Sequence, residues 1–293
     1  MSLPSVTAIV VSYHTGPRLR ECLYALIGCP DVSAIRIVDN GNPPGMSQWL
    51  QDFTARQDRV TLIDPGANLG FGKGVNLACE EAPAGFLLLV NPDAVIKRDA
   101  IAAMIAAAGP LQRPWIAGGK IFGLDGQEGR GARRRELTMW RALSSAAGFD
   151  TWNLNKSPAP DGPVPVGAVS GAFLLTDAES FRQLGGFDEA YFLHVEDVDF
   201  CRRIAEAGGQ VMYTPFAVAM HYGSTSQVSA TFVEYNKAKG LTRYFHKNAN
   251  TQLGRLMAKA SFYGFAPLLV VRSAVIRSLM QARQALRDLR VKR

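Results

Sequence analysis

The sequence predicts an α/β fold built around a mainly parallel central sheet. Short runs rich in Val and Ile alternate with segments in which apolar residues recur at helical spacing, a pattern typical of parallel strands joined by helices. The chain has 293 residues, 47% hydrophobic and 19% charged. This balance suits a globular protein with one or two cores and argues against disorder.

The first 90 residues repeat a unit of strand, loop and helix. We predict strands at residues 6–11, 34–38, 60–63 and 85–90, with helices at 18–27, 47–57 and 72–81. A long Pro/Gly/Asn loop is expected at 153–167. It is followed by a strand at 168–175, a short helix, a helix that opens near Glu196, and a strand at 211–213.

Ligands of such sheets bind at the carboxyl ends of the strands. The polar loops that follow the predicted strands are therefore candidate sites: His14 and Thr15, Asp39 and Asn40, residues 68–73, and residues 91–93.

The chain is basic, with 32 Lys and Arg against 25 Asp and Glu and a formal charge of +7. This charge is compatible with nucleic acid, anionic lipid or phosphorylated small molecules. Because no nucleic-acid reader motif is recognisable, we expect no nucleic-acid partner. The four cysteines lack paired CxxC spacing, and the N-terminus does not read as a signal peptide, so we expect a cytoplasmic protein.

The C-terminal part has a different character, which predicts two regions, 1–225 and 226–293. Residues 255–276 are too short an apolar run, broken by Pro267 and Arg272, for a spanning helix. Residues 273–293 alternate apolar and basic side chains, as an interfacial helix on the inner face of an anionic membrane would. The alternatives are a helix that packs on the catalytic domain or on a partner subunit, so a homo-oligomer stays open.

Six segments occur together in one order: VTAIVVSYHTGPRLRECLYAL, IRIVDNG, NLGFGKGVN, LLLVNPDA, GGFDEAYFLHVEDVDFCRR and HYGSTS. Over residues 5–226 the chain thereby resembles family 2 glycosyltransferases, most closely their bacterial rhamnosyltransferase-like branch. The resemblance implies the GT-A nucleotide-sugar transferase fold, a nucleotide-binding α/β domain continuous with an acceptor-binding part, followed here by a C-terminal helical extension.

By this resemblance Asp39 binds the base or ribose of a nucleotide. The alternative is that its carboxylate forms an Asx-turn or a helix cap before Gly41. Ser12 and His14 follow the first strand and are expected to line the same pocket.

The glycine-rich run 68–76 precedes a helix, so its backbone can approach a phosphate or ribose at the helix N-terminus. Its spacing differs from the GxGxxG dinucleotide fingerprint. We assign Asn68, Gly70, Lys73 and Asn76 to donor binding, with a solvated lysine as the alternative for Lys73.

Asn91-Pro92-Asp93 stands where the family has its Asp-x-Asp motif, with Asn91 in place of the first aspartate. We assign both residues to donor binding, and Asp93 with His221 to a divalent metal, since Mg²⁺ and Mn²⁺ prefer hard ligands and keep several from substrate and water. The alternatives are a polar turn and a structural histidine. Ser224 and Thr225 are weaker candidates for a phosphate contact.

Asp197 matches the family's catalytic base, and Glu196 is the alternative base or an acceptor-positioning residue. A helix N-terminus keeps a carboxylate ionised, which suits a base. The alternative for the cluster is an ordinary acidic first turn of a helix. Asp199 is expected to cap the helix or to pair with Arg202 or Arg203.

Arg133, Arg134 and Arg135 form the densest positive cluster. They are assigned to an acceptor that carries phosphate, such as a lipid-linked diphosphate. A solvated charge run is the alternative.

Together these residues predict an inverting, metal-dependent transferase that moves a sugar from a dTDP- or UDP-linked donor to a glycan or lipid-linked hydroxyl in bacterial surface polysaccharide synthesis. The alternatives are a sugar-nucleotide nucleotidyltransferase and a non-catalytic nucleotide-binding module. A nucleotidyltransferase is expected to carry a GxGxR-like loop after the first strand, where this chain has SYHTGPR.

Overall fold

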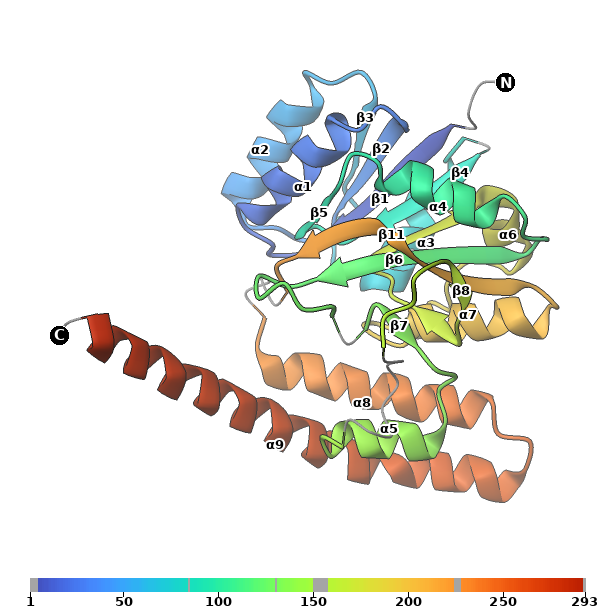
Figure 1. The fold of residues 1–293 in the computed structure, drawn as a ribbon, viewed down its shortest axis with the longest axis vertical. Coiled ribbons are helices and arrows are strands. Elements are labelled where there is room, and N and C mark those ends of the chain that lie inside the picture. The colour runs from blue at the N-terminus through green and yellow to red at the C-terminus, as the bar shows by residue number, and fades with distance from the viewer. Residues whose placement is uncertain (1–4, 84, 130, 150–157, 224–227, 292–293) are drawn as a thin grey trace. The chain divides into compact units, whose positions relative to one another are not determined.

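The computed structural model describes residues 5–83, 85–129, 131–149, 158–223 and 228–291 (Figure 1). The chain separates into two compact units. The first comprises Met1–Leu137 and Leu154–Gln227, and the second comprises Thr138–Asn153 and Val228–Arg293.

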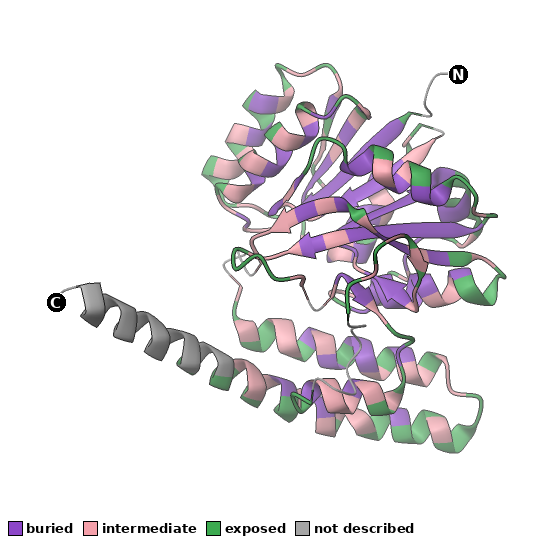
Figure 2. Ribbon diagram, viewed as in Figure 1, coloured by how far each residue is buried: buried purple, intermediate pink, exposed green. Residues whose placement is uncertain are grey.

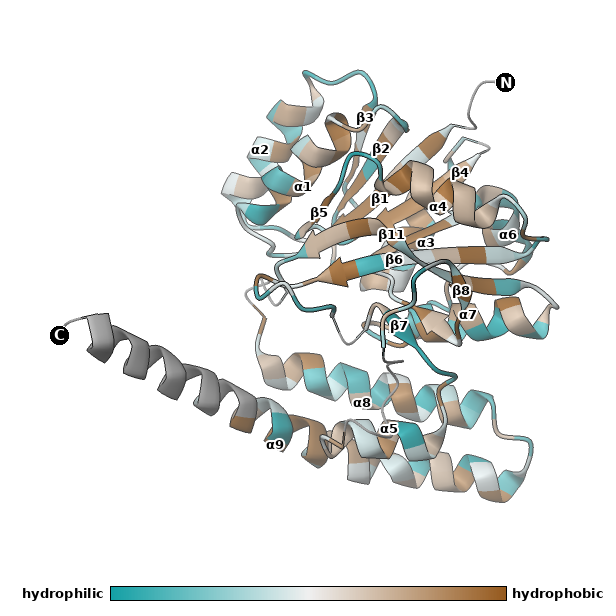
Figure 3. Ribbon diagram, viewed as in Figure 1, coloured by the Kyte–Doolittle hydropathy of each residue, from teal (hydrophilic) through white to brown (hydrophobic). Residues whose placement is uncertain are grey.

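The N-terminal half of the first unit is a parallel sheet. Its strands lie in the order β3-β2-β1-β4 and have these bounds: β1 Val6–Ser12, β2 Val32–Asp39, β3 Val60–Ile63 and β4 Phe86–Val90. Every residue of β1 is buried, because helices cover both faces of the sheet and leave no side of the strand to solvent. Figures 2 and 3 show the central strands β1 and β4 as mostly buried and largely hydrophobic, whereas β3 at the edge is partly exposed.

Three helices connect these strands: α1 Arg18–Ile27, α2 Pro44–Thr54 and α3 Phe71–Glu80. The chain moves one way across the sheet through α1 and α2 and returns through α3, so right-handed crossovers place α3 on the opposite face. The strand order reverses between β1 and β4. The crevice for a ligand therefore lies at the carboxyl ends of these two strands.

The remainder of the sheet mixes directions. Strand β10 (Phe173–Asp177) runs antiparallel between β4 and β6 (Trp115–Phe122). Strand β11 (Gln210–His221) is parallel to β6 and antiparallel to β5 (Ala94–Ile96) and β8 (Val164–Pro165). These strands complete a nine-stranded sheet in the described residues. Helices α4 (Ala100–Ala108), α6 (Ala178–Gln183) and α7 (Glu196–Glu206) also belong to this unit.

The prediction of one strand at 168–175 was wrong, because this segment forms two separate strands. Residues Ala168–Val169 form β9, which pairs with β7 (Arg133–Arg134) in a separate two-stranded sheet. The chain then turns at Ser170, whose carbonyl accepts from Phe173 N at 3.2 Å and whose hydroxyl accepts from Ala172 N at 3.3 Å. The apolar run does not reveal this turn, since both strands are buried.

The second unit is helical, with α5 (Met139–Ala146), α8 (Ala230–Lys247) and α9 (Gln252–Val291). Aromatic pairs join α8 to α9: Tyr235 with Phe262 at 5.6 Å between ring centroids, and Phe245 with Phe265 at 6.1 Å. Arg272 of α9 donates to the Ser145 carbonyl of α5. Across the described part of the chain, no helix has both the length and the apolarity needed to cross a bilayer.

Candidate active site

Asp39 lies at the end of β2 and is only 6% exposed. Its Oδ1 accepts from Asn42 N at 2.8 Å, from Asn42 Nδ2 at 2.9 Å and from Gly41 N at 3.3 Å. This is the Asx-turn that the sequence left as the alternative. Among the described residues Oδ2 has no hydrogen-bond partner, so one carboxylate oxygen shapes the loop and the other can accept from a ligand.

Ser12 and His14 have different surroundings. Ser12 is fully buried, and its hydroxyl lies 3.2 Å from Thr15 Oγ1 and donates to Asn42 Oδ1 at 3.1 Å. Its predicted place on the pocket surface does not fit this burial, and it supports the loop instead. His14 is half-buried with a φ of 51° and contacts the Tyr13 ring, so it stays a candidate for the pocket wall.

The glycine-rich loop is fastened to the end of β2 by two amide side chains. Asn40 Nδ2 donates to Asn68 Oδ1 at 2.9 Å, and Asn40 Oδ1 accepts from Leu69 N at 2.8 Å. Asn68 Oδ1 also accepts from Gly70 N at 3.0 Å. The sequence placed Asn40 in a candidate loop but gave it no role; in the structure it holds the glycine-rich loop.

Gly70 begins α3 with a φ of 81°, and a Cβ there would lie 2.3 Å from the Phe192 carbonyl oxygen. Glycine is required at this position because both the backbone conformation and the space exclude a side chain. The close approach brings the segment before α7 against the N-terminus of α3.

Two other predicted donor residues point elsewhere. Lys73 is half-exposed and lies 3.8 Å from Glu189, as a surface ion pair. Asn76 donates to the Phe187 carbonyl at 2.8 Å and accepts from Phe187 N at 2.9 Å. Since both ends of its amide are used within the protein, Asn76 holds the 184–188 turn and does not fit the predicted donor contact.

Asn91, Asp93 and His221 converge at the ends of β4 and β11. His221 Nε2 lies 2.9 Å from Asp93 Oδ1 and 3.2 Å from Asn91 Nδ2. The register of β11 against β5 brings this about, because it sets His221 opposite Ala94, the residue after Asp93. His221 therefore ends strand β11, which is longer than the strand predicted at 211–213.

This pair of donors fits a divalent ion. The carboxylate oxygen of Asp93 suits both Mn²⁺ and Mg²⁺, and the neighbouring imidazole nitrogen of His221 suits Mn²⁺ better than Mg²⁺. In the described residues no group of three or more His, Cys, Asp or Glu side chains could hold a metal. The donor set thus matches an ion that takes its other ligands from a diphosphate and water. Ser224 and Thr225 lie outside the described residues.

Helix α7 begins after two residues with left-handed backbone, His194 with a φ of 69° and Val195 with a φ of 77°. Such strain in residues other than glycine costs about 1–3 kcal/mol each and gathers at functional sites. The helix start that follows these two residues places the Asp197 carboxylate among three hydrogen-bond donors. Its Oδ1 accepts from Val198 N at 2.8 Å, its Oδ2 accepts from Gly171 N at 3.0 Å, and the Arg134 guanidinium lies 3.4 Å from Oδ2.

Glu196 is equally buried but differently placed. It is 5% exposed, and its Oε2 has no hydrogen-bond partner among the described residues. Burial, and next the charge of Asp197, raise the pKa of Glu196 to about 8. The two adjacent carboxyl groups thus have different surroundings, and those of Glu196 favour its protonated form.

The side chains of Arg133, Arg134 and Arg135 have three different environments. Arg133 is buried, pairs with Glu128 at 3.0 Å and stacks on Tyr213, so it does not fit the predicted acceptor contact. Arg134, the next residue of β7, faces Asp197, and Arg135 is exposed. The alternation of side chains along β7 separates the structural arginine from the one at the site.

Gly171 and Ala172 connect the two halves of the site. Ala172 O accepts from Asn91 N at 2.9 Å, and the neighbouring Gly171 N donates to Asp197 at 3.0 Å. The predicted metal loop and the predicted base are therefore held by backbone groups of two adjacent residues. The turn that interrupts the expected strand 168–175 makes this possible.

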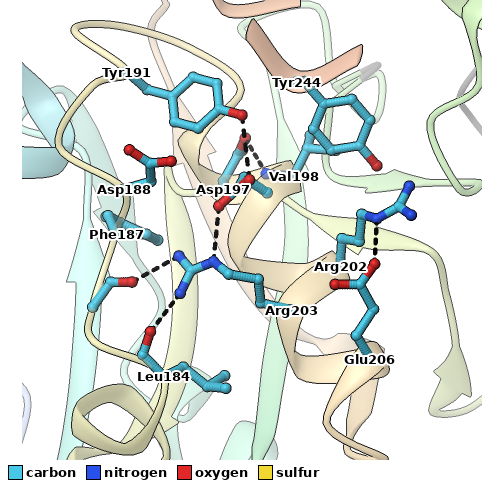
Figure 4. A network of polar contacts seen from close by, with 12 residues as sticks. Leu184, Phe187, Asp188, Tyr191, Asp197, Val198, Arg202, Arg203, Glu206 and Tyr244 are labelled. Carbon is cyan, nitrogen blue, oxygen red and sulfur yellow. Dashed lines mark hydrogen bonds and ion pairs between the residues drawn. The ribbon is translucent and has the colours of Figure 1, made fainter. Parts of the chain in front are cut away.

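Behind the site, Arg203 fastens α7 to the 184–188 turn (Figure 4). It pairs with Asp199 at 2.8 Å and donates to the carbonyls of Leu184 and Gly186 at 2.6 and 2.7 Å. This confirms the predicted pairing of Asp199 with Arg203, whereas Arg202 pairs with Glu206 at 2.7 Å.

Comparison with known proteins finds glycosyltransferases among the relatives of this chain. A family model described as "Glycosyltransferase like family 2" matches residues 4–240. The N-acetylglucosaminyl-diphospho-decaprenol L-rhamnosyltransferase of Mycobacterium tuberculosis is 30% identical over 237 residues, which cover 74% of this chain and 76% of the relative. Rhamnosyltransferase WbbL of Escherichia coli is 25% identical over 228 residues, covering 74% and 83%.

Solved structures of low identity share the fold. The mannosyltransferase PcManGT from Pyrobaculum calidifontis, in complex with GDP-Man and Mn²⁺, superposes with a TM-score of 0.58 at 17% identity, over 98% of this chain and 81% of that one. GalNAc-T7 with UDP, GalNAc and Mn²⁺ superposes with a TM-score of 0.57 at 15% identity, over 75% and 43%. The predicted GT-A fold is thus confirmed, and the chain belongs to the family 2 glycosyltransferases, as a rhamnosyltransferase-like enzyme.

Proposed function

We propose that the chain is an inverting, metal-dependent glycosyltransferase that moves a rhamnose-like sugar from a nucleotide diphosphate to the hydroxyl of a lipid-linked or glycan acceptor in surface polysaccharide synthesis. The observation that carries the proposal is the link through Gly171 and Ala172. The Gly171 N–H donates to Asp197, and the Ala172 carbonyl accepts from Asn91 N. These two contacts hold the proposed base beside a loop suited to a diphosphate.

The donor nucleotide is assigned to the carboxyl ends of β1 and β2. Asp39 Oδ2 is free to accept from a base edge or ribose hydroxyl, with His14 in the same loop region. Gly70 is left out of this assignment, because the Phe192 carbonyl packs against it and accepts from Phe71 N at 3.0 Å at the N-terminus of α3. The rhamnosyltransferase names of the relatives favour dTDP-rhamnose, with a UDP-sugar as the second choice.

Asp93 and His221 are assigned to the divalent ion, with Asn91 beside them. When bound, the ion would supply positive charge to the leaving diphosphate. Only one of the two motif positions is an aspartate here. The protein therefore contributes one negative charge fewer to the ion than an Asp-x-Asp pair would.

Asp197 is assigned as the base, because its neighbour is poorly suited to the task. A carboxyl group with a pKa near 8 is mostly protonated at pH 7 and cannot take up a proton, which describes Glu196. Asp197 would take the proton of the acceptor hydroxyl as that oxygen bonds to the anomeric carbon. The bond to the diphosphate breaks on the opposite face, and the anomeric configuration inverts.

Arg134 and Arg135 are assigned to the acceptor side. Arg134 already lies against Asp197, and Arg135 is exposed two residues beyond the buried Arg133. A guanidinium pair suits a phosphate-bearing acceptor, and the mycobacterial relative is named for a diphospho-decaprenol acceptor. Such an acceptor is presented at a membrane, which favours a cytoplasmic protein at the inner membrane face.

Calorimetric titration tests the proposal. The protein is titrated with dTDP, UDP and GDP, and each titration is done once in Mn²⁺ and once in EDTA. We expect one nucleotide to bind with Mn²⁺ and its affinity to fall about tenfold or more in EDTA. Asp93→Asn should abolish the metal effect, while Asp99→Asn, at an exposed position, serves as the control. Absence of binding by every nucleotide would favour the non-catalytic module.

A further inference from the structure

Helix α9 exposes a continuous apolar stripe. Seven large apolar side chains between residues 253 and 275 are at least 40% exposed: Leu253, Leu256, Met257, Tyr263, Leu268, Val271 and Val275. At 3.6 residues per turn they fall on one side of the helix, in a band about 140° wide and about 33 Å long. We call this surface the α9 stripe.

The α9 stripe is separate from the face that α9 uses for packing. Ala258, Phe265 and Leu269 are at most 3% exposed and lie on the side that meets α8 and α5 within the second unit. The helix therefore has two apolar faces, one packed and one open. Figures 2 and 3 show described segments of α9 that are both exposed and hydrophobic.

Exposed apolar side chains are concentrated in this unit. Trp140 and Phe149, next to or within α5, are 71% and 65% exposed, and Phe232 and Tyr235 of α8 are 41% and 48% exposed. The described residues of the first unit contribute only three large exposed hydrophobics, Tyr24, Leu124 and Phe216. An apolar surface of this extent marks an interaction site.

Charge is segregated in the same way. The second unit contains fourteen basic residues (Lys and Arg) and three acidic residues (Asp and Glu). The rest of the chain contains eighteen basic and twenty-two acidic residues. The whole positive surplus of the protein therefore belongs to the second unit. Two of its cations, Arg255 and Lys259, are exposed on α9, and at 100° per residue Lys259 lies about 40° beyond one edge of the stripe.

These charges decide between two occupants of the α9 stripe. A second copy of this chain would bring an equally positive surface, so its approach is opposed by repulsion. An anionic leaflet offers acyl chains to the stripe and complementary headgroups to the flanking Lys and Arg. A position in the interface also agrees with the absence, in the described helices, of one able to cross the bilayer.

We propose that the α9 stripe docks onto an anionic bilayer surface, with α9 lying in the interface and Lys259 at headgroup level. This deepens the proposed function, since it assigns the surface by which the enzyme would reach a lipid-linked acceptor. The docking itself requires no sugar transfer.

Co-sedimentation of the full-length protein with vesicles tests the docking. The vesicles are phosphatidylcholine alone, or phosphatidylcholine with about one-third phosphatidylglycerol. Wild type should pellet with the anionic vesicles, and Leu256→Gln/Val271→Gln should lower the partition coefficient about tenfold or more. Arg255→Gln/Lys259→Gln should lower it too, and most strongly at low salt.

Leu124→Gln/Phe216→Gln removes two equally exposed apolar side chains from the first unit and should bind as wild type does. Nucleotide titration of the same variants separates the two proposals, because the α9 variants should keep wild-type nucleotide affinity. Wild-type vesicle binding by Leu256→Gln/Val271→Gln, or no binding by wild type, overturns the docking. Sedimentation velocity showing a wild-type dimer that this variant dissociates would also overturn it and assign the stripe to self-association.

Discussion

At the scale of single residues, two adjacent carboxyl groups have opposite surroundings. Asp197 receives two peptide N–H groups and a guanidinium, whereas the Glu196 carboxyl is buried with one oxygen unpartnered in the described structure. Peptide donors and a cation stabilise an ionised carboxylate, and burial without them stabilises the acid. Burial, and next the charge of Asp197, therefore raise the pKa of Glu196.

Asp197→Asn should lower kcat for sugar transfer by about a thousandfold or more, because the amide cannot accept the acceptor proton. Nucleotide affinity should stay within about twofold. Glu196→Gln should keep most of the activity at pH 7, since the amide resembles the protonated acid. Transfer assays at saturating donor measure both, and a fully active Asp197→Asn variant would move the base elsewhere, first to Glu196.

Glu196 should also make stability depend on pH. Its pKa rises from 4.5 to about 8 on folding, so between these values the folded protein retains a proton that the unfolded chain has lost. The free energy of unfolding therefore falls as pH rises from about 5 to 8, by at most about 1.4 kcal/mol per pH unit from this group.

Glu196→Gln should remove that slope, as measured by urea unfolding at several pH values between 5 and 8. Glu80→Gln, at an exposed position near the end of α3, should leave it unchanged. An identical slope in Glu196→Gln and wild type would show that the carboxyl is ionised in the folded protein.

At the scale of elements, the 184–188 turn joins α3 to α7. Asn76 of α3 binds the Phe187 backbone on one side, and Arg203 of α7 binds Leu184 and Gly186 on the other. Each polar group is satisfied inside the protein, which holds the N-terminus of α7 in place. The GGFDE segment, quoted above as a family motif, has a packing role in this structure.

Gly186→Ala should destabilise this connection more than Gly185→Ala. Both glycines have left-handed backbone, with φ of 68° and 71°. Only a Cβ at Gly186 meets a neighbour, at 2.5 Å from Asn76 Oδ1, and nothing lies within 4 Å of one at Gly185. The free energy of unfolding should therefore fall by about 1–3 kcal/mol more in Gly186→Ala. Equal losses would mean that Asn76 moves aside without cost.

At the scale of the whole molecule, the two units carry opposite charge and different surfaces. The unit that contains the site is net negative, and the helical unit is strongly positive and apolar outside. Net charge acts over the distance of the Debye length, about 10 Å at 0.1 M salt, so it can guide one unit to an anionic surface.

Transfer to an acceptor held in anionic vesicles should therefore weaken with added salt. Between about 0.05 and 0.5 M NaCl, kcat/KM should fall several-fold more for a vesicle-embedded polyprenyl diphosphate acceptor than for a water-soluble analogue. A parallel salt dependence for both acceptors would assign the effect to the active site and not to the surface of α9.

The sequence by itself determined the local structure and the identity of the chemistry. Residues 18–27 and 60–63 have the predicted helix and strand bounds, and short motifs singled out Asp93, Asp197 and His221 as candidates, because periodicity and short motifs are properties of neighbouring residues. Only the tertiary structure decided how these residues are used. Asn76, Ser12 and Arg133 have the residue types of ligand contacts. In the structure Asn76 binds Phe187, Ser12 binds Asn42, and Arg133 is buried against Tyr213, each a contact between distant parts of the chain. Packing between distant segments also decides three other features: the turn at Ser170, the raised pKa of Glu196 and the exposed face of α9. No local sequence pattern contains this information.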